Sequence, residues 1–474
     1  MSWVPLGAAP PHSLEPVQQM HELRSYYEKQ TMRAVLQSSL GLDSFSGSTG
    51  HNAALTDHTV VIGIDTEAWT RNTNEMTEIG LAVYERKDMV NVQEAVKLWR
   101  NPYSVYANET DPLGPFGEEL LRKISFYHLR IVENAHLKTD AKWMKGAEGN
   151  RFGHSRFVTF AEARAILDML FNQPIISDNP ALAGCKKPII LLGHAISHDR
   201  TNCKDNGLDY DWFKHGTIVK EIDTQPLAKA TRTWFDAAAP NNDVGLEKLT
   251  RTLGYEHMDP HTACNDAART LIAAIQMVLP KECRDGYRKN MQAVALDLEI
   301  YSRSTQAPSW GTVFYCTRCG GRDHDNKDGS RCAVPVHCNA CAQYDGMLNK
   351  ENSMQGFRTF EEVEEEHWET HIEECCQHVA DFKAWQRRCN DAKRKRRPLP
   401  PGPPEGTHPP SGEYVVYETV PHPIVDPKST PSARVIMYQS SGRRRRGHRS
   451  STTQRANPWD VDWRHNDEGR VNKR

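Results

Sequence analysis

The run Val60-Val-Ile-Gly-Ile-Asp65-Thr-Glu67 places two carboxylates at the end of a short apolar stretch. Such a β-branched run is typical of a buried strand. Because side chains alternate from face to face along a strand, we expect Asp65 and Glu67 to project on the same side where the strand leaves the core. Crowded acids repel each other unless a cation lies between them, and Mg²⁺ binds carboxylate oxygens while keeping positions for water and phosphate. The run alone also fits an acidic strand end in solvent, so a metal site needs further ligands.

Two later segments supply those ligands. A continuous apolar run over residues 187–193 predicts a buried strand, and Asp199 follows where a helix could begin. An N-capping aspartate is the alternative interpretation. The alanine-rich segment 265–279 predicts a helix with a broad apolar face, with Asp266 in its first turn and His261 in the loop before it. This would place an imidazole beside a metal-binding carboxylate; the alternative is a surface histidine before an ordinary acidic first turn.

The order Asp-x-Glu, Gly-His-x4-Asp and His-x4-Asp before an alanine-rich helix resembles the DEDDh 3′–5′ exonuclease family of the ribonuclease H-like superfamily, over residues 57–280. The flanking residues resemble a fungal branch, the Gfd-type nuclease-like domain proteins. The resemblance implies a divalent-metal-dependent 3′–5′ exonuclease that hydrolyses phosphodiester bonds of RNA or single-stranded DNA. It also implies a nucleic-acid 3′ end as the partner.

The resemblance implies a role for each of five residues. Asp65, Glu67 and Asp266 would hold a first Mg²⁺ or Mn²⁺. Asp65 would bridge to a second ion held by Asp199, and His261 would take a proton from the attacking water. A cation pair about 3.5–4 Å apart suits an in-line phosphoryl displacement, and an imidazole with a pKa near neutrality suits a general base.

Two departures from the family pattern bear on substrate access. His198 stands where the family usually has an aromatic residue, and the long interval between Glu67 and Asp199 implies an insertion. The insertion interleaves basic and aromatic residues, which could grip a single strand or lie in a solvated loop. These residues are Lys138, Lys142, Trp143, Lys145, Arg151, Phe152, His154, Arg156 and Phe157.

The remaining patterns predict an α/β fold, a ribonuclease H-like mixed sheet flanked by helices. Further strands are expected at 78–84, 92–99 and 218–222, and helices at 159–171, with Thr159 as cap, and 244–253. A candidate helix from Leu14 to Leu40 could dock on the domain or bind a partner, but it is expected to belong to a weakly ordered leader. We predict five regions: a partly helical or disordered leader (1–56), the exonuclease-like domain (57–280), a helical linker leading away from it (281–310), a zinc-binding region (311–389) and a Pro-rich basic disordered tail (390–474).

The zinc prediction rests on closely spaced thiols and an imidazole, which suit tetrahedral Zn²⁺ with a structural role. The candidates are Cys316, Cys319, His324, Cys332, Cys338 and Cys341. The first four fit a zinc knuckle with an unusually long last gap. Alternatively, the two Cys-x2-Cys pairs share one ion as a ribbon. A second ion could use Cys338 and Cys341 with His371, Cys375 or His378.

Charge and composition suggest a compartment. The chain has 12 cysteines and no basic, then apolar, leader, which favours metal binding in a reducing compartment over secretion. No apolar run approaches the roughly 18 residues of a membrane span, so no membrane partner is expected. Residues 390–474 carry 17 Lys or Arg against 9 Asp or Glu, and such basic clusters serve nuclear import or RNA contacts. We therefore expect a nuclear or nucleocytoplasmic protein, with possible protein partners at the zinc region or tail.

Two functions remain open from the sequence. The first is the exonuclease. The alternative is a nucleic-acid-binding adaptor with a catalytically silent nuclease-like domain, because more than half of the chain lies outside the resemblance and is rich in binding features.

Overall fold

A computed structural model describes residues 15–43, 51–89, 111–137, 145–235, 242–326, 332–345, 369–404, 406–412, 415–418 and 434–437. The chain divides into two units at Gly412/Glu413. The described part of the second unit is an antiparallel pair, β7 (Val415–Glu418) and β8 (Arg434–Met437). The predicted strand at 92–99, the insertion residues Lys138, Lys142 and Trp143, and most of the tail that was expected to be disordered lie outside the described residues.

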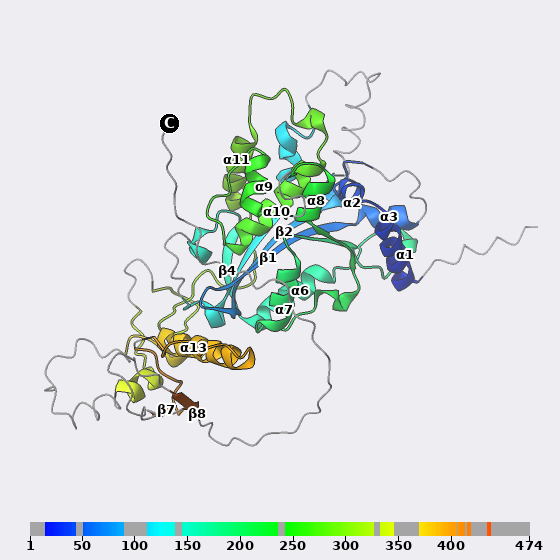
Figure 1. The fold of residues 1–474 in the computed structure, drawn as a ribbon. Coiled ribbons are helices and arrows are strands. Elements are labelled where there is room, and N and C mark those ends of the chain that lie inside the picture. The colour runs from blue at the N-terminus through cyan, green and yellow to red at the C-terminus, as the bar shows by residue number, and fades with distance from the viewer. Residues whose placement is uncertain are drawn as a thin grey trace, which may run out of the picture. The chain divides into compact units, whose positions relative to one another are not determined.

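The first unit is built on a six-stranded mixed sheet in the order β4-β3-β2-β1-β5-β6 (Figure 1). β2 runs antiparallel to both neighbours, and the other pairs are parallel. The strands are β1 (Val60–Trp69), β2 (Asn72–Glu85), β3 (Ser125–Ile131), β4 (His154–Val158), β5 (Ile189–Gly193) and β6 (Ile218–Asp223).

Helices cover both faces of this sheet (Figure 1). One face carries α1 (Pro16–Glu28), α2 (Met32–Ser39), α8 (Thr224–Ala230), α9 (Leu246–Thr252), α10 (Ala263–Val278) and α11 (Met291–Ser304). The other carries α6 (Phe160–Phe171) and α7 (Ser197–Asp205). Further α-helices are α3 (His51–Asp57), α5 (Glu118–Leu121) and α13 (Gln377–Arg394), and residues 339–345 are also helical. Short 3-10 helices span Arg86–Met89, Pro115–Gly117, Val132–Asn134, Gly146–Gly149, Pro180–Leu182, Trp212–His215, Lys281–Cys283 and Glu373–Cys375. The predicted α/β, ribonuclease H-like class is confirmed. No helix among these described ones has the length and hydropathy needed to span a bilayer.

Residue patterning explains the layers. In β1, Val60, Ile62 and Ile64 pack beneath α6 and α7, whereas Val61 packs beneath α10. The same alternation directs Asp65 and Glu67 to the α10 side, as predicted for residues two apart in a strand. The predicted helix at 159–171 is α6, and its predicted cap is present: the Thr159 side chain accepts from the Glu162 amide while Glu162 reaches back, which forms a capping box.

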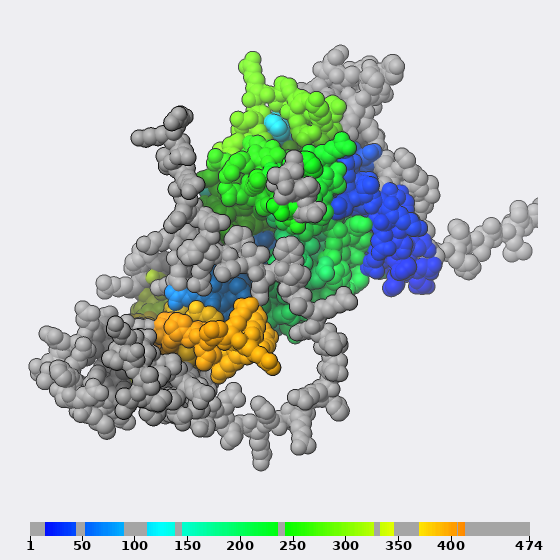
Figure 2. Space-filling model, viewed as in Figure 1, coloured from blue at the N-terminus to red at the C-terminus, as the bar shows by residue number. Residues whose placement is uncertain are grey.

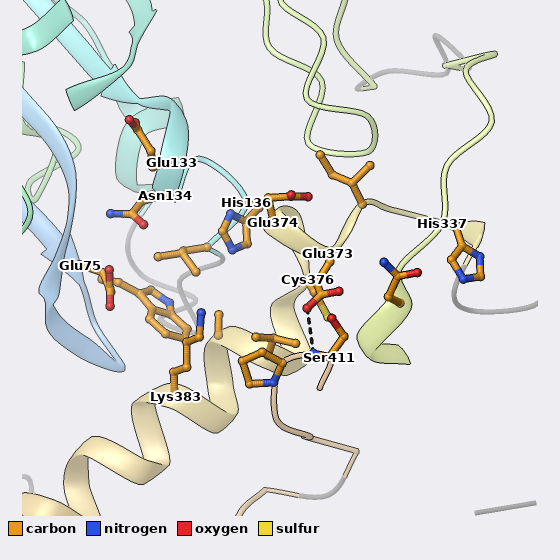
Figure 3. A pocket seen from close by; sticks show the side chains of 17 residues that line it. Glu75, Glu133, Asn134, His136, His337, Glu373, Glu374, Cys376, Lys383 and Ser411 are labelled. Carbon is orange, nitrogen blue, oxygen red and sulfur yellow. Dashed lines mark hydrogen bonds between the residues drawn. The ribbon is translucent and has the colours of Figure 1, made fainter. Parts of the chain in front are cut away.

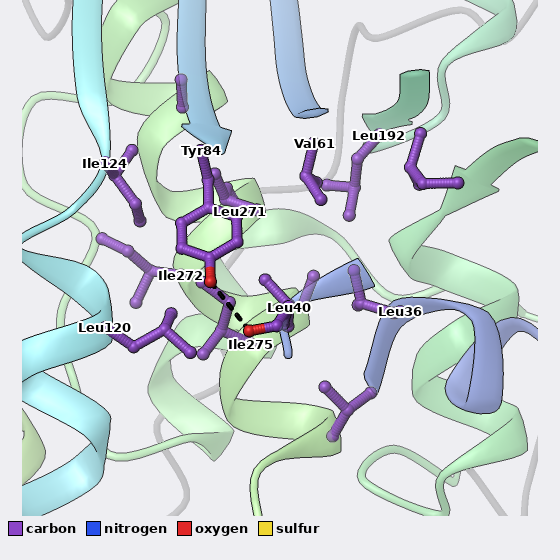
Figure 4. Packing of buried hydrophobic residues seen from close by; sticks show 14 of the residues in the cluster. Leu36, Leu40, Val61, Tyr84, Leu120, Ile124, Leu192, Leu271, Ile272 and Ile275 are labelled. Carbon is purple, nitrogen blue, oxygen red and sulfur yellow. Dashed lines mark hydrogen bonds between the residues drawn. The ribbon is translucent and has the colours of Figure 1, made fainter. Parts of the chain in front are cut away.

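The N-terminal leader differs from the expectation of weak order. The single helix expected from Leu14 to Leu40 is two helices, α1 and α2, separated at Thr31, which caps α2. Leu23, Leu36 and Leu40 are fully buried in the core with α10. The Tyr84 hydroxyl donates a 2.8 Å hydrogen bond to the Leu40 carbonyl (Figure 4). The leader thus forms part of the main core.

Two other expectations were wrong. Part of the supposed insertion between Glu67 and Asp199 is β3 and β4, which extend the sheet, and Phe152 and Phe157 are buried in it. The helix expected to lead away after residue 281 starts at Met291 and packs back on the core through Val294 and Leu298. In addition, α13 continues to Arg394 and so enters the segment expected to be disordered from 390.

Glycines let α10 approach the sheet closely. Gly80 lies opposite Asp65 in the β1–β2 register. A Cβ at Gly80 would lie 2.0 Å from the carbonyl oxygen of Ala263, and one at Gly63 would lie 3.1 Å from that of Ala267. The first turns of α10 therefore rest on β1 and β2 where those strands carry no side chains.

We expect Gly80→Ala to destabilise the protein by about 3 kcal/mol or more, because the methyl group would meet backbone atoms of α10 that cannot move independently. The free energy of unfolding in urea is the measurement. Gly402→Ala is the control, since a Cβ there meets nothing within 4 Å. Equal stability of the two variants would contradict the close approach.

Candidate active site

Three elements bring the five predicted site residues to one end of the sheet. Asp65 and Glu67 lie toward the end of β1, Asp199 lies in the first turn of α7, and Asp266 lies in the first turn of α10. His261 lies in the loop that enters α10. Ligand atoms of Glu67, His261 and Asp266 lie within 4.8 Å of one another.

Asp199 is fixed by the backbone of β1. Its Oδ1 accepts hydrogen bonds from both the amide and the hydroxyl of Thr66, each 2.8 Å long, and only 4% of the residue is exposed. Asn202, one turn later, donates to the Thr66 hydroxyl at 3.0 Å. Ile196, not Asp199, stands at the helix cap. Asp199 therefore faces β1 instead of serving as the capping aspartate of the alternative interpretation.

His261 has an unusual backbone conformation that ties it to α10. Its φ of 59° is in the left-handed region, which non-glycine residues rarely adopt. Its amide donates to Oδ2 of Asp266 at 3.2 Å, and its Nδ1 lies 3.7 Å from Oε1 of Glu67. About half of its side chain is exposed, so the imidazole can reach a bound molecule.

The carboxylates are crowded in a buried setting. Burial, reinforced by Asp199, Asp266 and Glu67, raises the pKa of Asp65 well above its usual range. Burial is also the main cause that raises the pKa of Glu67 to about 7 and that of Asp199 to about 7. The carboxylate of Glu67 in turn raises the pKa of His261. Without a cation, this group resists carrying its full negative charge at neutral pH.

A divalent cation fits this group of residues. Oδ2 of Asp65 is buried and has no hydrogen-bond partner among the residues that the structure describes. In the part of the chain that the structure describes, the basic partners of these carboxylates are the histidines His261 and His257, and neither lysine nor arginine pairs with them. Unpaired carboxylate oxygens are the ligands that Mg²⁺ and Mn²⁺ prefer. Metal ions at this position would therefore satisfy an acceptor that the protein leaves open.

Sequence reasoning missed Glu78. This residue lies opposite Glu67 in the β1–β2 register and is 3% exposed. Its Oε2 accepts from the Ala263 amide at 3.2 Å and lies 2.8 Å from Nε2 of His128, whose other ring nitrogen lies 2.7 Å from the Ser155 hydroxyl. The signal in the sequence was an acid at the start of an apolar strand, but its position beside Glu67 depends on the strand register.

His257 was also missed. Its Nε2 lies 2.9 Å from Oδ1 of Asp266, and its side chain is 2% exposed. It lies beside Oδ1 of Asp266, whereas the His261 amide donates to Oδ2. The sequence offered no signal beyond its place four residues before His261.

A cleft of about 530 Å³ opens beside Glu67 and His261. Its walls come from the sheet, from the loop that carries Lys145, and from residues after the main domain, namely Tyr315, Thr317 and Asn326. Arg130 and Lys145 are the basic residues of the lining. Of the nine basic and aromatic residues expected either to grip a strand or to lie in a solvated loop, Lys145 and Phe157 line this cleft. Lys145 also pairs with Asp259 at 2.8 Å, and Arg151 pairs with Glu299 and Asp259.

Within the described parts of the chain, Cys and His residues form two clusters. One is Cys316, Cys319, His324 and Cys332, and the other is Cys338, Cys341, His371 and Cys376. The knuckle pairing is thus the one that the structure contains. The ribbon pairing was wrong, and the fourth member of the second cluster is Cys376 instead of Cys375 or His378.

Distances within the clusters fit zinc. With Zn–S near 2.3 Å and Zn–N near 2.05 Å, tetrahedral ligands lie about 3.8 Å apart for two sulfurs and about 3.5 Å for sulfur and nitrogen. Sγ of Cys341 lies 3.7 Å from Sγ of Cys376 and 3.6 Å from Nε2 of His371. In the first cluster, Sγ of Cys319 lies 3.5 Å from Nε2 of His324. Each cluster could hold one tetrahedral ion.

The first cluster is docked on the sheet. Phe157 in the edge strand β4 exchanges two backbone hydrogen bonds with Thr312, of 2.8 and 3.0 Å. Arg322, which lies between two cluster residues in the sequence, forms a bidentate ion pair with Glu162 at 2.9 and 2.8 Å. These contacts hold Tyr315 in the wall of the cleft.

A second cavity of about 560 Å³ shares part of its lining with the cleft and is also lined by Cys376 of the second cluster (Figure 3). Trp69, Asn134, His136 and Leu137 line both spaces. Burial lowers the pKa of His136 to about 4, so this histidine is neutral at physiological pH. The second cluster therefore borders, through Cys376, a cavity that shares these four lining residues with the cleft.

Residues 60–277 match a family model described as the DNA polymerase III subunit epsilon-like, C-terminal domain, DEDDh type. This part of the chain is similar to DEDDh exonucleases. The match supports an exonuclease-type function in general and includes all five predicted site residues. It covers somewhat under half of the chain, so both Cys/His clusters and α13 lie outside the DEDDh-like part. A comparison with curated proteins finds no match.

The raised carboxyl pKa values predict a pH-dependent stability of the DEDDh-like part. Between the usual 4.5 and about 7 the folded protein holds a proton on Glu67 that the unfolded chain releases, so this contribution to stability is lost as pH rises through about 7. Without added Mg²⁺, we expect Glu67→Gln to gain roughly 1–3 kcal/mol over wild type between pH 5.5 and pH 8. Urea unfolding measures this. Mg²⁺ should narrow the gap, and a gap independent of pH, like that expected for the exposed Glu282→Gln control, would contradict the assignment.

The cluster composition predicts the zinc content of single variants. We expect two Zn²⁺ per wild-type chain and one in Cys316→Ser or Cys338→Ser, because each variant removes a ligand from one cluster. Cys375→Ser is the matched control and should keep two, since Cys375 contacts the Tyr315 hydroxyl and belongs to neither cluster. Metal analysis of the purified proteins is the measurement. Loss of zinc from Cys375→Ser would show that the ligands of the second cluster are assigned wrongly.

Proposed function

We propose that residues 57–280 form a divalent-metal-dependent 3′–5′ exonuclease that hydrolyses phosphodiester bonds of RNA or single-stranded DNA. The observation that carries the proposal is the set of four acids and one histidine at one end of the sheet. One buried oxygen of Asp65 has no hydrogen-bond partner within the described ranges. The similarity of residues 60–277 to the DEDDh family supports the reaction class.

In this proposal Asp65, Glu67 and Asp266 hold one Mg²⁺ or Mn²⁺, and Asp65 with Asp199 holds a second. Bound ions would activate water and stabilise charge on the attacking and leaving oxygens. The chain's own part is to fix the ligands in advance. Thr66 holds Asp199 with two hydrogen bonds, and the His261 amide holds Asp266. Such fixed ligands reduce the reorganisation needed when substrate binds.

His261 is proposed as the general base. Its half-exposed imidazole faces the cleft and is joined through its own backbone to Asp266. It must be neutral to accept a proton from water at Nε2 or Nδ1, and Glu67 raises its pKa. The reaction rate should therefore rise with pH until this group has lost its proton.

The cleft supports attack at a strand end. Its volume of about 530 Å³ suits a nucleotide-sized ligand. Arg130 and Lys145 in the lining are paired with Glu148 and Asp259, so a phosphate would have to compete with these carboxylates for them. The two Cys/His clusters are proposed as structural zinc sites within a region spanning 311–389. The basic tail beyond 390 is proposed to direct the protein to the nucleus or nucleocytoplasm and to contact partners, and the nearness to the fungal Gfd-type branch stays a prediction.

Purified protein would be given 5′-labelled RNA and DNA oligonucleotides with Mg²⁺ or Mn²⁺. We expect stepwise shortening from the 3′ end, a loss of at least about 10³-fold for Asp65→Asn, and a loss of about 10²–10⁴-fold for His261→Asn with metal binding retained. Glu282→Gln, an exposed acid, should behave as wild type.

Three outcomes separate the alternatives. Equal activity of wild type and Asp65→Asn would refute the catalytic assignment. Oligonucleotide binding without cleavage by wild type would favour the adaptor with a silent nuclease-like domain. Loss of metal affinity in His261→Asn would make His261 a ligand or a support instead of the base.

A further inference from the structure

A groove of about 750 Å³ lies between α13 and the tip of the β1–β2 hairpin. Figure 2 shows α13 in orange directly against the blue surface of that hairpin segment. Most of the groove lies outside the DEDDh-like residues, because α13 begins directly after Cys376, the last ligand of the second cluster.

Polar contacts fix the two walls of the groove to each other. Nη1 of Arg71, in the hairpin turn, lies 2.6 Å from Oδ1 of Asp381 on α13. Nη1 of Arg387 on α13 donates to the Asn72 side chain at 2.8 Å and lies 3.7 Å from Glu75. The hairpin and α13 each supply an arginine that contacts the other wall, so the groove is formed in the free protein.

The lining of the groove is strongly positive. Its cations are Arg71, Arg387, Arg388, Arg394, Lys395 and Arg397, and its one acid is Asp391. Asp391 pairs with both Arg394, at 2.6 Å, and Lys395, at 3.0 Å. The rest of the lining is mostly polar, with Thr70, Thr73, Asn74 and Asn390. A surface with this surplus of guanidinium groups and little apolar area suits repeated phosphates.

The groove borders the active-site cleft. Thr70 lines both spaces. It lies three residues after Glu67 at the end of β1, which at about 3.3 Å per residue is a distance of about 10 Å. A strand that leaves the cleft along the hairpin would therefore meet the basic residues of α13.

We propose that this groove binds the sugar-phosphate backbone of a single nucleic-acid strand whose 3′ end occupies the cleft. The proposal rests on the proposed exonuclease function for the direction of the strand, but binding in the groove does not require cleavage. It assigns α13 the task of holding substrate upstream of the scissile bond.

Binding can be measured apart from catalysis in an Asp65→Asn background with Ca²⁺ as the only added metal. A fluorescent single-stranded 20-mer is titrated in fluorescence anisotropy at several salt concentrations. We expect Arg388→Gln with Arg394→Gln to weaken binding at least 10-fold and to reduce the slope of log K against log salt by about 1.4, because about 0.7 is expected per lost phosphate contact on a single strand. The loss should be smaller for a tetranucleotide, which reaches less of the groove.

Two further variants keep the test decisive. Lys281→Gln with Arg303→Gln removes two exposed cations elsewhere and should leave the 20-mer affinity unchanged. Asp391→Asn removes the acid of the groove and should tighten binding, which an unfolded variant could not do. Equal affinity of the Arg388/Arg394 variant and the Lys281/Arg303 variant would overturn the proposal. So would displacement of the 20-mer by polyglutamate as effective as by an unlabelled oligonucleotide, since that would identify an acidic peptide as the ligand.

The two proposals fail in distinguishable ways. If the protein cleaves no oligonucleotide but the groove variants weaken binding, the exonuclease is refuted and the groove stands. If wild type degrades oligonucleotides but the groove variants bind the 20-mer as tightly as the control, the groove is refuted and the exonuclease stands.

Discussion

The close approach of α10 to the sheet is the contact on which the rest of this molecule depends. It is possible because β1 and β2 present backbone, at Gly63 and Gly80, where α10 crosses them. The same approach places the amide of Ala263 on Glu78 and carries Asp266 into the neighbourhood of Glu67. This well-packed backbone contact therefore brings together acidic side chains that their mutual repulsion would otherwise keep apart.

This assembly sets stability against function. Buried acids with raised pKa values lower the stability of the metal-free fold near neutral pH. The opposing contribution comes from the large core beneath α10, to which the N-terminal helices add Leu23, Leu36 and Leu40. α1 and α2 lie outside the DEDDh-like segment, yet they are packed extensively in this core. Their packing helps to hold the crowded acids of the site in place.

Local patterns in the sequence predicted much of this structure. The run ending in Asp65 and Glu67, the capped helix α6 and the alanine-rich α10 each depend on residues close together in the chain, and each was predicted. Contacts between distant segments could not be predicted from the sequence. The position of Glu78 beside Glu67 depends on the strand register, and the choice of Cys376 over Cys375 as a ligand depends on how distant segments meet in space. The edge strand β4 was taken for an insertion because its basic residues hide a short pairing segment, and α1 and α2 were judged weak because their burial depends on α10.

One feature of the second cluster has an evolutionary consequence. Cys341 and His371 would be joined through a single ion, which would fix the two ends of the intervening chain in space whatever its length. Closing a flexible loop costs only about 0.6 kcal/mol more for each doubling of its length. Insertions or deletions between these two ligands should therefore accumulate among relatives of this protein far more freely than changes in the spacing of Cys338 and Cys341.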